Sequence, residues 1–255
     1  MGSIEESLKN LKKFWPENAP DISHVPKYVS KYKNEKIVIK CGGKVLIEPD
    51  LFNKFIEDIA ILYKLGITVI IVHGGGPRIK LELEKLNIES QFINGLRITS
   101  KKTMAVVEKA LINFNFEIVE KLKKKECKAQ GLNVGQNNIF IVEQESKSLG
   151  YVGRPKKILN EKIQAIVEQK QIPVISPMGK DDKGEKYNIN ADTAAAAIAK
   201  SLKSRRLLLM TDVVGVYDKN KKLINEIKPT EAKELINKKI VEGGMIPKLL
   251  NSIDA

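Results

Sequence analysis

The sequence predicts an α/β fold in which an open, mostly parallel sheet is sandwiched by helices. Strand-like and helix-like segments alternate along the chain from residue 36 onward. The run at 67–73 (ITVIIVH) is almost continuously apolar and β-branched, which is typical of a parallel strand covered on both faces. Glycine clusters follow the first two predicted strands, where each strand feeds a helix. The 255 residues suffice for one large domain or two small ones with a buried core.

The first 35 residues precede the first predicted strand and are expected to form a kinked helical arm. Ser3 and Glu6 fit a capping box, and Pro16 and Pro20 interrupt the helical spacing. This segment has no arginine and no apolar h-region, so neither a secretory signal nor a transit peptide is expected. Its apolar stripe must pack either on its own domain or on a neighbouring subunit. The stripe consists of Ile4, Leu8, Leu11, Trp15, Val25, Tyr28, Val29 and Tyr32.

Strands and helices alternate after the arm. Strands are expected at 36–41, 67–73, 172–176 and 206–211, the last three of them buried. Helices are expected at 50–65, 77–86, 100–124, 161–169 and 191–202, where apolar residues recur at helical spacing. Residues 127–157 are expected to form a hairpin of short strands outside the main sheet, and 180–186 the polar tip of a second hairpin. A further helix is expected after the glycines at 243 and 244.

The charge of the chain invites a nucleic-acid role, which its composition disfavours. The formal net charge is +13, from 44 Lys and Arg against 31 Asp and Glu. Only five of the basic residues are arginine, whereas recognition of bases and phosphates depends largely on bidentate hydrogen bonds from arginine. We therefore expect solvated lysine faces and no nucleic-acid partner.

Cysteine content and hydropathy indicate the cellular compartment in which the protein is expected. Two cysteines, Cys41 and Cys127, cannot make a disulfide framework or a four-cysteine zinc site. No apolar run approaches the roughly 18 residues of a membrane span. A cytoplasmic protein without a membrane partner is expected.

Two glycine clusters point to anion binding. The common phosphate-binding signatures, such as the P-loop, are absent. Gly42 and Gly43 instead follow the first strand, and 74–76 follows the second. Glycines at such turns let backbone N–H groups approach an anion. One such pair is explained by a tight turn alone, but two on consecutive strands favour a ligand site at this edge of the sheet.

Several polar residues sit at the same predicted edge. Lys40 lies in an apolar strand, where an unpaired ammonium is costly to bury. Arg97 lies in a loop and is suited to fork onto a carboxylate. Asn190 is either a helix cap or a ligand contact. Asp212 follows a predicted strand, and Lys248 follows two glycines.

These residues fall in seven motifs: KCGG at 40–43, HGGGP at 73–77, NGLRIT at 94–99, GYVG at 150–153, NINAD at 188–192, TDVVGV at 211–216 and GGMIPK at 243–248. In this order they resemble the amino acid kinase family, and within it the members that phosphorylate N-acetyl-L-glutamate. The likeness covers roughly residues 36–250. It implies ATP-dependent phosphorylation of the side-chain carboxylate of N-acetyl-L-glutamate, a step of arginine biosynthesis.

The resemblance also implies roles for individual residues. Lys40 and Lys248 act on the transferring phosphoryl group, and Asp192 holds both lysines. Mg²⁺ is bound through the ATP phosphates, with no metal ligand set from the protein. Phosphoryl transfer of this kind needs positioning and charge neutralisation rather than a protein base. The substrate-binding set is Gly75, Gly76, Arg97, Asn188 and Asn190; the nucleotide-binding set is Gly42, Gly43, Thr211, Asp212, Gly215, Val216 and Tyr217.

The resemblance further implies an organisation of the chain. The arm at 1–35 is expected to serve oligomerisation, with residues 36–255 forming the kinase domain. Within that domain, 36–178 binds acetylglutamate and 179–255 binds ATP. A homo-oligomer is expected, a dimer extended toward a hexamer through the arm, with L-arginine as a possible feedback inhibitor. The family pattern continues for a few tens of residues past the position of Ala255, so we expect the natural protein to be longer.

Two residues depart from the family pattern, and two other functions stay open. Cys41 and Arg78 stand where other side chains are usual; Cys41 is either a small packed residue or a reactive thiol. One alternative function is a related kinase for another carboxylate or phosphate, which the pairing of Arg97 with Asn188 disfavours. The other is a non-catalytic, arginine-sensing domain, which would have no need of Lys40, Asp192 and Lys248.

Overall fold

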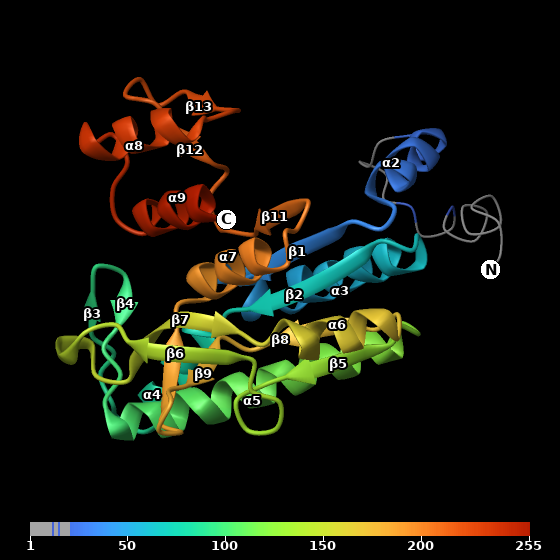
Figure 1. Cartoon of the computed structure of the whole chain (residues 1–255). Helices are drawn as coiled ribbons and strands as arrows, with labels where there is room; N and C mark the ends of the chain where they lie inside the picture. The colour runs from blue at the N-terminus through green and yellow to red at the C-terminus, as the bar shows by residue number, and fades with distance from the viewer. Residues whose placement is uncertain (1–11, 13–14, 16–20) are drawn as a thin grey trace.

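The computed structural model describes residues 12, 15 and 21–255. Its centre is a five-stranded parallel sheet in the order β11-β1-β2-β8-β5 (Figure 1). β1 and β2 pair from Lys36 opposite Thr68 to Cys41 opposite His73, so the glycine clusters that follow them leave the sheet side by side. The strands are β1 (Lys36–Cys41), β2 (Thr68–His73), β5 (Ala129–Leu132), β8 (Ile172–Ile175) and β11 (Arg206–Leu209).

Helices cover both faces of this sheet. α3 and α5 bury Phe52 and Phe114 against one face, while α6 and α7 bury apolar residues against the other. Because successive strand residues point to opposite faces, Ile71 joins the first core and Ile70 the second. The predicted fold class is confirmed. These helices are α3 (Pro49–Lys64), α5 (Lys101–Lys124), α6 (Asn160–Glu168) and α7 (Ala191–Ser201).

A smaller four-stranded sheet closes on itself in the order β10-β7-β6-β9. Phe140 and Ile189 of this sheet pack in the same core as α6 and α7. The hairpin predicted around 180–186 is confirmed, since β9 and β10 pair antiparallel on either side of that tip. Its strands are β6 (Phe140–Gln144), β7 (Val152–Ile158), β9 (Met178–Lys180) and β10 (Lys186–Ile189).

The remaining elements lie outside the five-stranded and four-stranded sheets. α4 packs on α5 through Ile79 and Leu83, and α9 lies against α7 (Figure 1). These elements are η3 (Gly43–Leu46), α4 (Gly76–Lys85), β3 (Phe92–Ile93), β4 (Leu96–Arg97), η4 (Lys147–Leu149), β12 (Val216–Tyr217), β13 (Leu223–Ile224), α8 (Pro229–Asn237) and α9 (Met245–Asp254). In the part of the chain that the structure describes, no helix combines the length and apolar character that crossing a membrane requires.

Two expectations about strands were wrong. Residues 127–157 do not lie wholly outside the main sheet, because β5 pairs parallel with β8 and becomes its edge strand. The strand predicted at 206–211 ends at Leu209 and is only half-buried, with Leu208 45% exposed. β11 is the edge strand on the side of the sheet opposite β5. Because β11 pairs with a strand on one side only, its residues are more exposed than their apolar sequence suggested.

The predicted arm is described only in part. Its stripe residues before Trp15, together with the break around Pro16 and Pro20, lie outside the described residues. η2 (Ile22–His24) and α2 (Val25–Tyr32) follow. Val25 is buried and Tyr32 packs against the main core, whereas Tyr28 is 51% exposed. The end of the arm therefore packs on its own domain.

Candidate active site

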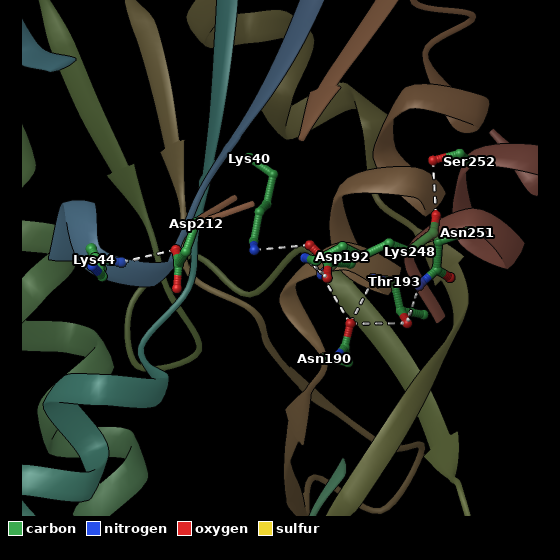
Figure 2. Close-up of polar contacts among 9 residues, drawn as sticks. All are labelled: Lys40, Lys44, Asn190, Asp192, Thr193, Asp212, Lys248, Asn251 and Ser252. Atoms are coloured by element: carbon green, nitrogen blue, oxygen red, sulfur yellow. Dashed lines mark hydrogen bonds and ion pairs between the residues drawn. The ribbon is translucent and has the colours of Figure 1, made fainter. Parts of the chain in front are cut away.

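Two lysines converge on one carboxylate at the edge of the sheet. Lys40, the last residue but one of β1, places its Nζ 2.9 Å from Oδ1 of Asp192. Lys248, on α9, donates from Nζ to Oδ2 of the same residue at 2.7 Å. Figure 2 shows both lysines converging on Asp192. The side chains of Lys40 and Asp192 are only 9% and 10% exposed, so the charges are largely removed from water and need one another.

Asp192 is held in place by the start of α7. Asn190 is the N-cap of that helix, and its Oδ1 accepts hydrogen bonds from the backbone N–H groups of Asp192 and Thr193 at 2.9 and 3.0 Å. A carboxylate in the first turn also complements the helix dipole. Burial by itself would raise the pKa of Asp192, but the charge of Lys40 and the hydrogen bond from Lys248 outweigh it and lower the pKa. Asp192 is therefore an anion at neutral pH.

The loop after β1 consists of glycines because two side chains occupy the adjacent space. A Cβ on Gly42 would lie 2.3 Å from Nζ of Lys40. Gly43 has a φ of +62°, which favours glycine, and its Cβ would lie 1.6 Å from Oδ1 of Asp212. That same Oδ1 accepts the backbone N–H of Lys44 at 3.1 Å. Asp212 thus reaches across from the segment after β11 to order the glycine loop (Figure 2).

A cavity of about 220 Å³ opens beside Lys40. The glycines after β1 and β2 form part of its wall, and Arg97, Asn188 and Asn190 form another part. The cavity is therefore of a size for a small polar molecule and is lined by glycines and by side chains that can donate hydrogen bonds. All five residues assigned to substrate binding from the resemblance line it: Gly75, Gly76, Arg97, Asn188 and Asn190.

Arg97, which lines this cavity, carries an unused hydrogen-bond donor. Its Nη2 donates to the carbonyl oxygen of Gly76 at 3.1 Å, and its guanidinium carbon lies 4.7 Å from the centre of the Phe92 ring. Its Nη1 is buried, with no partner among the described residues. Burial also lowers the pKa of Arg97, because the guanidinium has lost water. A buried charged donor without a partner is costly, so this geometry favours an anionic ligand.

The nucleotide-binding set is brought to the site only in part. Gly42 and Gly43 line the cavity and Asp212 contacts the loop they form. The other members, Thr211, Gly215, Val216 and Tyr217, lie between β11 and β13 and do not line this cavity. Tyr217 is 43% exposed. The structure therefore brings three of the seven predicted nucleotide-binding residues, Gly42, Gly43 and Asp212, to the cavity or to the glycine loop that lines it.

Two polar side chains support the glycine turn after β2; Asn115 was missed from the sequence, and His73 was included in the motif at 73–77 without a role. Asn115 donates from Nδ2 to the carbonyl of Val174 at 2.8 Å and lies 3.2 Å from Nε2 of His73. The Nδ1 of that histidine lies 2.9 Å from the carbonyl oxygen of Gly74. With Nδ1 as the donor and Nε2 as the acceptor, both contacts are satisfied by a neutral imidazole. The signal in the sequence that could have revealed Asn115 is its place, as an asparagine, within the apolar stripe of the long helix α5.

Arg78 connects three elements around the same turns. Its Nε donates to the carbonyl of Leu46 in η3 at 2.6 Å, and its Nη1 donates to Glu117 of α5 at 2.6 Å. Its guanidinium carbon lies 4.1 Å from the centre of the Phe114 ring. From the sequence, Arg78 was noted only as a departure from the family pattern; in the structure it joins η3, α4 and α5.

Cys41 is a packed residue. Its side chain is fully buried in the core under α3, and burial raises the pKa of its thiol to about 12 despite the nearby charges of Lys40 and Arg78. The thiolate, the reactive form, is therefore disfavoured, and of the two options left open by the sequence the structure favours the first.

His73 is expected to make stability depend on pH. Burial, together with the charge of Arg78, lowers the pKa of this histidine to about 4, against a counteracting hydrogen bond to Gly74. An unfolded chain binds the proton near pH 6.5, so between pH 6.5 and 4 the unfolded state holds more protons. The free energy of unfolding should fall as pH falls through this window, by about 2 kcal/mol at pH 5.

Urea unfolding at pH 7 and pH 5 measures this effect. His73→Gln should remove most of that loss, whereas His24→Gln, at an exposed histidine, should retain it. An equal loss of stability in all three proteins would contradict a neutral, buried His73.

Comparisons with known proteins agree with this site. A family model described as "Amino acid kinase family" matches residues 35–255. The chain belongs to the amino acid kinase family. It is therefore a kinase. It is 50% identical to the acetylglutamate kinase of Pelagibacter ubique over 250 residues, which is 98% of this chain and 86% of that protein. The acetylglutamate kinase of Caldicellulosiruptor saccharolyticus is 42% identical over 89% of this chain and 81% of that protein.

Solved structures of amino acid kinase folds also resemble it. The crystal structure of smu.665 from Streptococcus mutans matches with a TM-score of 0.78 and 33% identity, over 86% of this chain and 89% of that one. An N-acetylglutamate synthase from Neisseria gonorrhoeae, complexed with coenzyme A and N-acetyl-glutamate, matches with a TM-score of 0.81 over 92% of this chain and 55% of that one. At 18% identity, this match shows the shared fold alone.

Proposed function

We propose that this chain transfers the γ-phosphoryl group of ATP to the side-chain carboxylate of N-acetyl-L-glutamate, forming N-acetyl-L-glutamyl 5-phosphate for arginine biosynthesis. The observation that carries the proposal is the Lys40–Asp192–Lys248 cluster beside a small cavity that Arg97 lines. The buried Nη1 of Arg97 has no partner among the described residues. The acetylglutamate kinase of Pelagibacter ubique, 50% identical over 98% of this chain, supports the proposal.

The reaction needs charge neutralisation and alignment. A carboxylate oxygen of the acceptor attacks the γ-phosphorus, the bond from that phosphorus to the β,γ-bridging oxygen breaks, and ADP leaves with the bond's electrons. The acceptor is already ionised at neutral pH, so no protein group has to remove a proton. Lys40 and Lys248 would stabilise the charge on the equatorial oxygens, and Asp192 keeps the two ammonium groups close without strong mutual repulsion.

The two substrates would occupy different parts of the site. Arg97 would bind the α-carboxylate of acetylglutamate, with Asn188 and Asn190 contacting its other polar atoms. The nucleotide would lie along Thr211–Tyr217, with its phosphates at Gly42 and Gly43. Arg97 would belong to an acetylglutamate-binding part at 36–178 and Thr211–Tyr217 to an ATP-binding part at 179–255. Gly42 and Gly43 of the first part and Asn188 and Asn190 of the second would meet in the cavity between the two substrates.

Mg²⁺ would be bound mainly through the phosphates. In residues 12, 15 and 21–255, no group of three or more His, Cys, Asp or Glu side chains is placed to hold a metal. Asp192 and Asp212 are the carboxylates beside the glycine loop, and both already accept hydrogen bonds. When bound, the ion would neutralise phosphate charge.

A coupled assay for ADP release, with and without N-acetyl-L-glutamate, tests this function. Release that depends on acetylglutamate is expected. Release that instead depends on aspartate, glutamate, carbamate or a nucleoside monophosphate would favour another acceptor. Binding of L-arginine without any ADP release would favour a sensing domain. The same assay with added L-arginine tests feedback inhibition, and a cytoplasmic location fits a reaction that consumes ATP.

We also propose that the protein is a homo-oligomer larger than a dimer. Large apolar side chains of α4, of the residue after it and of α5 are exposed, among them Leu81, Leu86 and Phe116 at 50%, 56% and 64%. A second copy of the chain would cover such exposed apolar surface. Because no proposed catalytic residue lies in the arm, deleting residues 1–33 should reduce the assembly to dimers and leave kinase activity largely intact. Light scattering on both chains measures this, and an unchanged mass would assign the arm to its own subunit.

A further inference from the structure

Lys248 enters the active site on α9, which lies against α7 without burying any of its own residues fully. Most of its apolar residues are partly buried, and polar contacts add to this packing in placing the helix. Its polar contacts with α7 are three: Lys248 to Asp192 at 2.7 Å, Asn251 Nδ2 to Thr193 Oγ1 at 3.2 Å, and an ion pair from Lys200 to Asp254 at 2.6 Å. The placement of the Lys248 ammonium therefore depends on these contacts.

Two of the three contacts lie side by side. Asp192 and Thr193 are consecutive in the first turn of α7 and are both held by the Asn190 cap. Lys248 and Asn251 are three residues apart on α9, and so share one face of it. Figure 2 shows the two pairs facing each other across the helices. Two adjacent contacts fix the rotation of α9 about its axis, which a single contact through the flexible stem of a lysine does not.

We infer that Asn251 and Thr193 are positioning residues for phosphoryl transfer, because their hydrogen bond sets where Lys248 presents its ammonium group. The inference rests on the proposed kinase function. Thr193 lies in the first turn of α7, whose N-cap residue Asn190 lines the cavity. Through its hydrogen bond to Thr193, Asn251 fixes the position of α9 relative to that turn. The bond would act on the transition state through Lys248, while neither residue touches the cavity.

The Lys200–Asp254 pair supplies a matched control. It joins the same two helices, but its side chains are 59% and 63% exposed, and it lies further along both helices from the Asp192 contact. Exposed ion pairs contribute little. Lys200→Ala removes a contact between α7 and α9 without removing the hydrogen bond beside Lys248.

Steady-state kinetics of the full chain with ATP and N-acetyl-L-glutamate test the inference. Asn251→Ala should lower kcat about fivefold, the value of one neutral hydrogen bond, with both KM values within twofold. Thr193→Ala should also lower kcat, whereas Thr193→Ser, which keeps the hydroxyl, should retain the wild-type value. The Asn251→Ala/Thr193→Ala double variant should be no slower than the slower single variant, because both lose the same bond. Lys200→Ala should leave kcat unchanged.

The outcomes separate this inference from the proposed function. Wild-type kcat in Asn251→Ala would overturn the inference, and so would an equal loss in Lys200→Ala, which would indicate general loosening of α9. Additive losses in the double variant would also overturn it, since Asn251 and Thr193 would then act separately. A wild-type chain without acetylglutamate-dependent ADP release would instead reject the proposed function itself.

Discussion

Replacing either lysine of the central cluster with alanine is expected to lower kcat by a factor on the order of 10²–10⁴, with much smaller changes in KM. Lys40 and Lys248 each contribute a full charge, held within 3 Å of Asp192 and largely screened from water. Their attraction for the phosphoryl oxygens should be greatest when charge spreads over those oxygens in the transition state. Loss of such a group reduces kcat more than ground-state binding.

Initial rates of ADP release over a range of both substrates measure this effect. Lys238→Ala is the control, because that lysine also pairs with a carboxylate, Glu234, but on the exposed side of α8, where both side chains are 65% exposed. Circular dichroism should show the same helix content in all variants. Turnover close to that of the wild type in Lys40→Ala or Lys248→Ala would reject the assignment of that lysine.

Replacing Arg97 with lysine is expected to raise the KM for N-acetyl-L-glutamate by roughly 10- to 100-fold, with the KM for ATP changed less than about twofold. The guanidinium is anchored by Gly76 and stacked on Phe92, which leaves Nη1 as a buried donor facing no protein acceptor among the described residues. A lysine keeps the charge but supplies neither the fork nor the stacked plane.

Arg154→Lys is the matched control for this variant. Arg154 belongs to the small sheet, like the strands that line the cavity, but its guanidinium pairs with Glu143 on the surface, with side chains 58% and 50% exposed. Its replacement should leave both KM values unchanged. A defect selective for ATP in Arg97→Lys would place Arg97 in the nucleotide subsite and reverse the proposed arrangement of the two substrates.

The sequence by itself determined the alternation of strands and helices and the edge of the sheet where the glycines gather. Periodicity is a local property, so α3, α5 and β2 were predicted within a few residues of their observed bounds. Lys40 was recognisable because a lysine in an apolar strand needs a partner. The identity of that partner came from the resemblance to a family, since Asp192 lies about 150 residues further along the chain.

Only the tertiary structure decided which strands are edges and which polar residues support the site. β5 and β11 were misjudged because burial depends on which strands lie beside them, and pairing between distant segments leaves no local pattern. Asn115, Arg78 and Asn251 reach partners 32 to 59 residues away in sequence. A single side chain signals its own chemistry, but the hydrogen bond it forms is set by the packing of whole helices, which a linear sequence does not display.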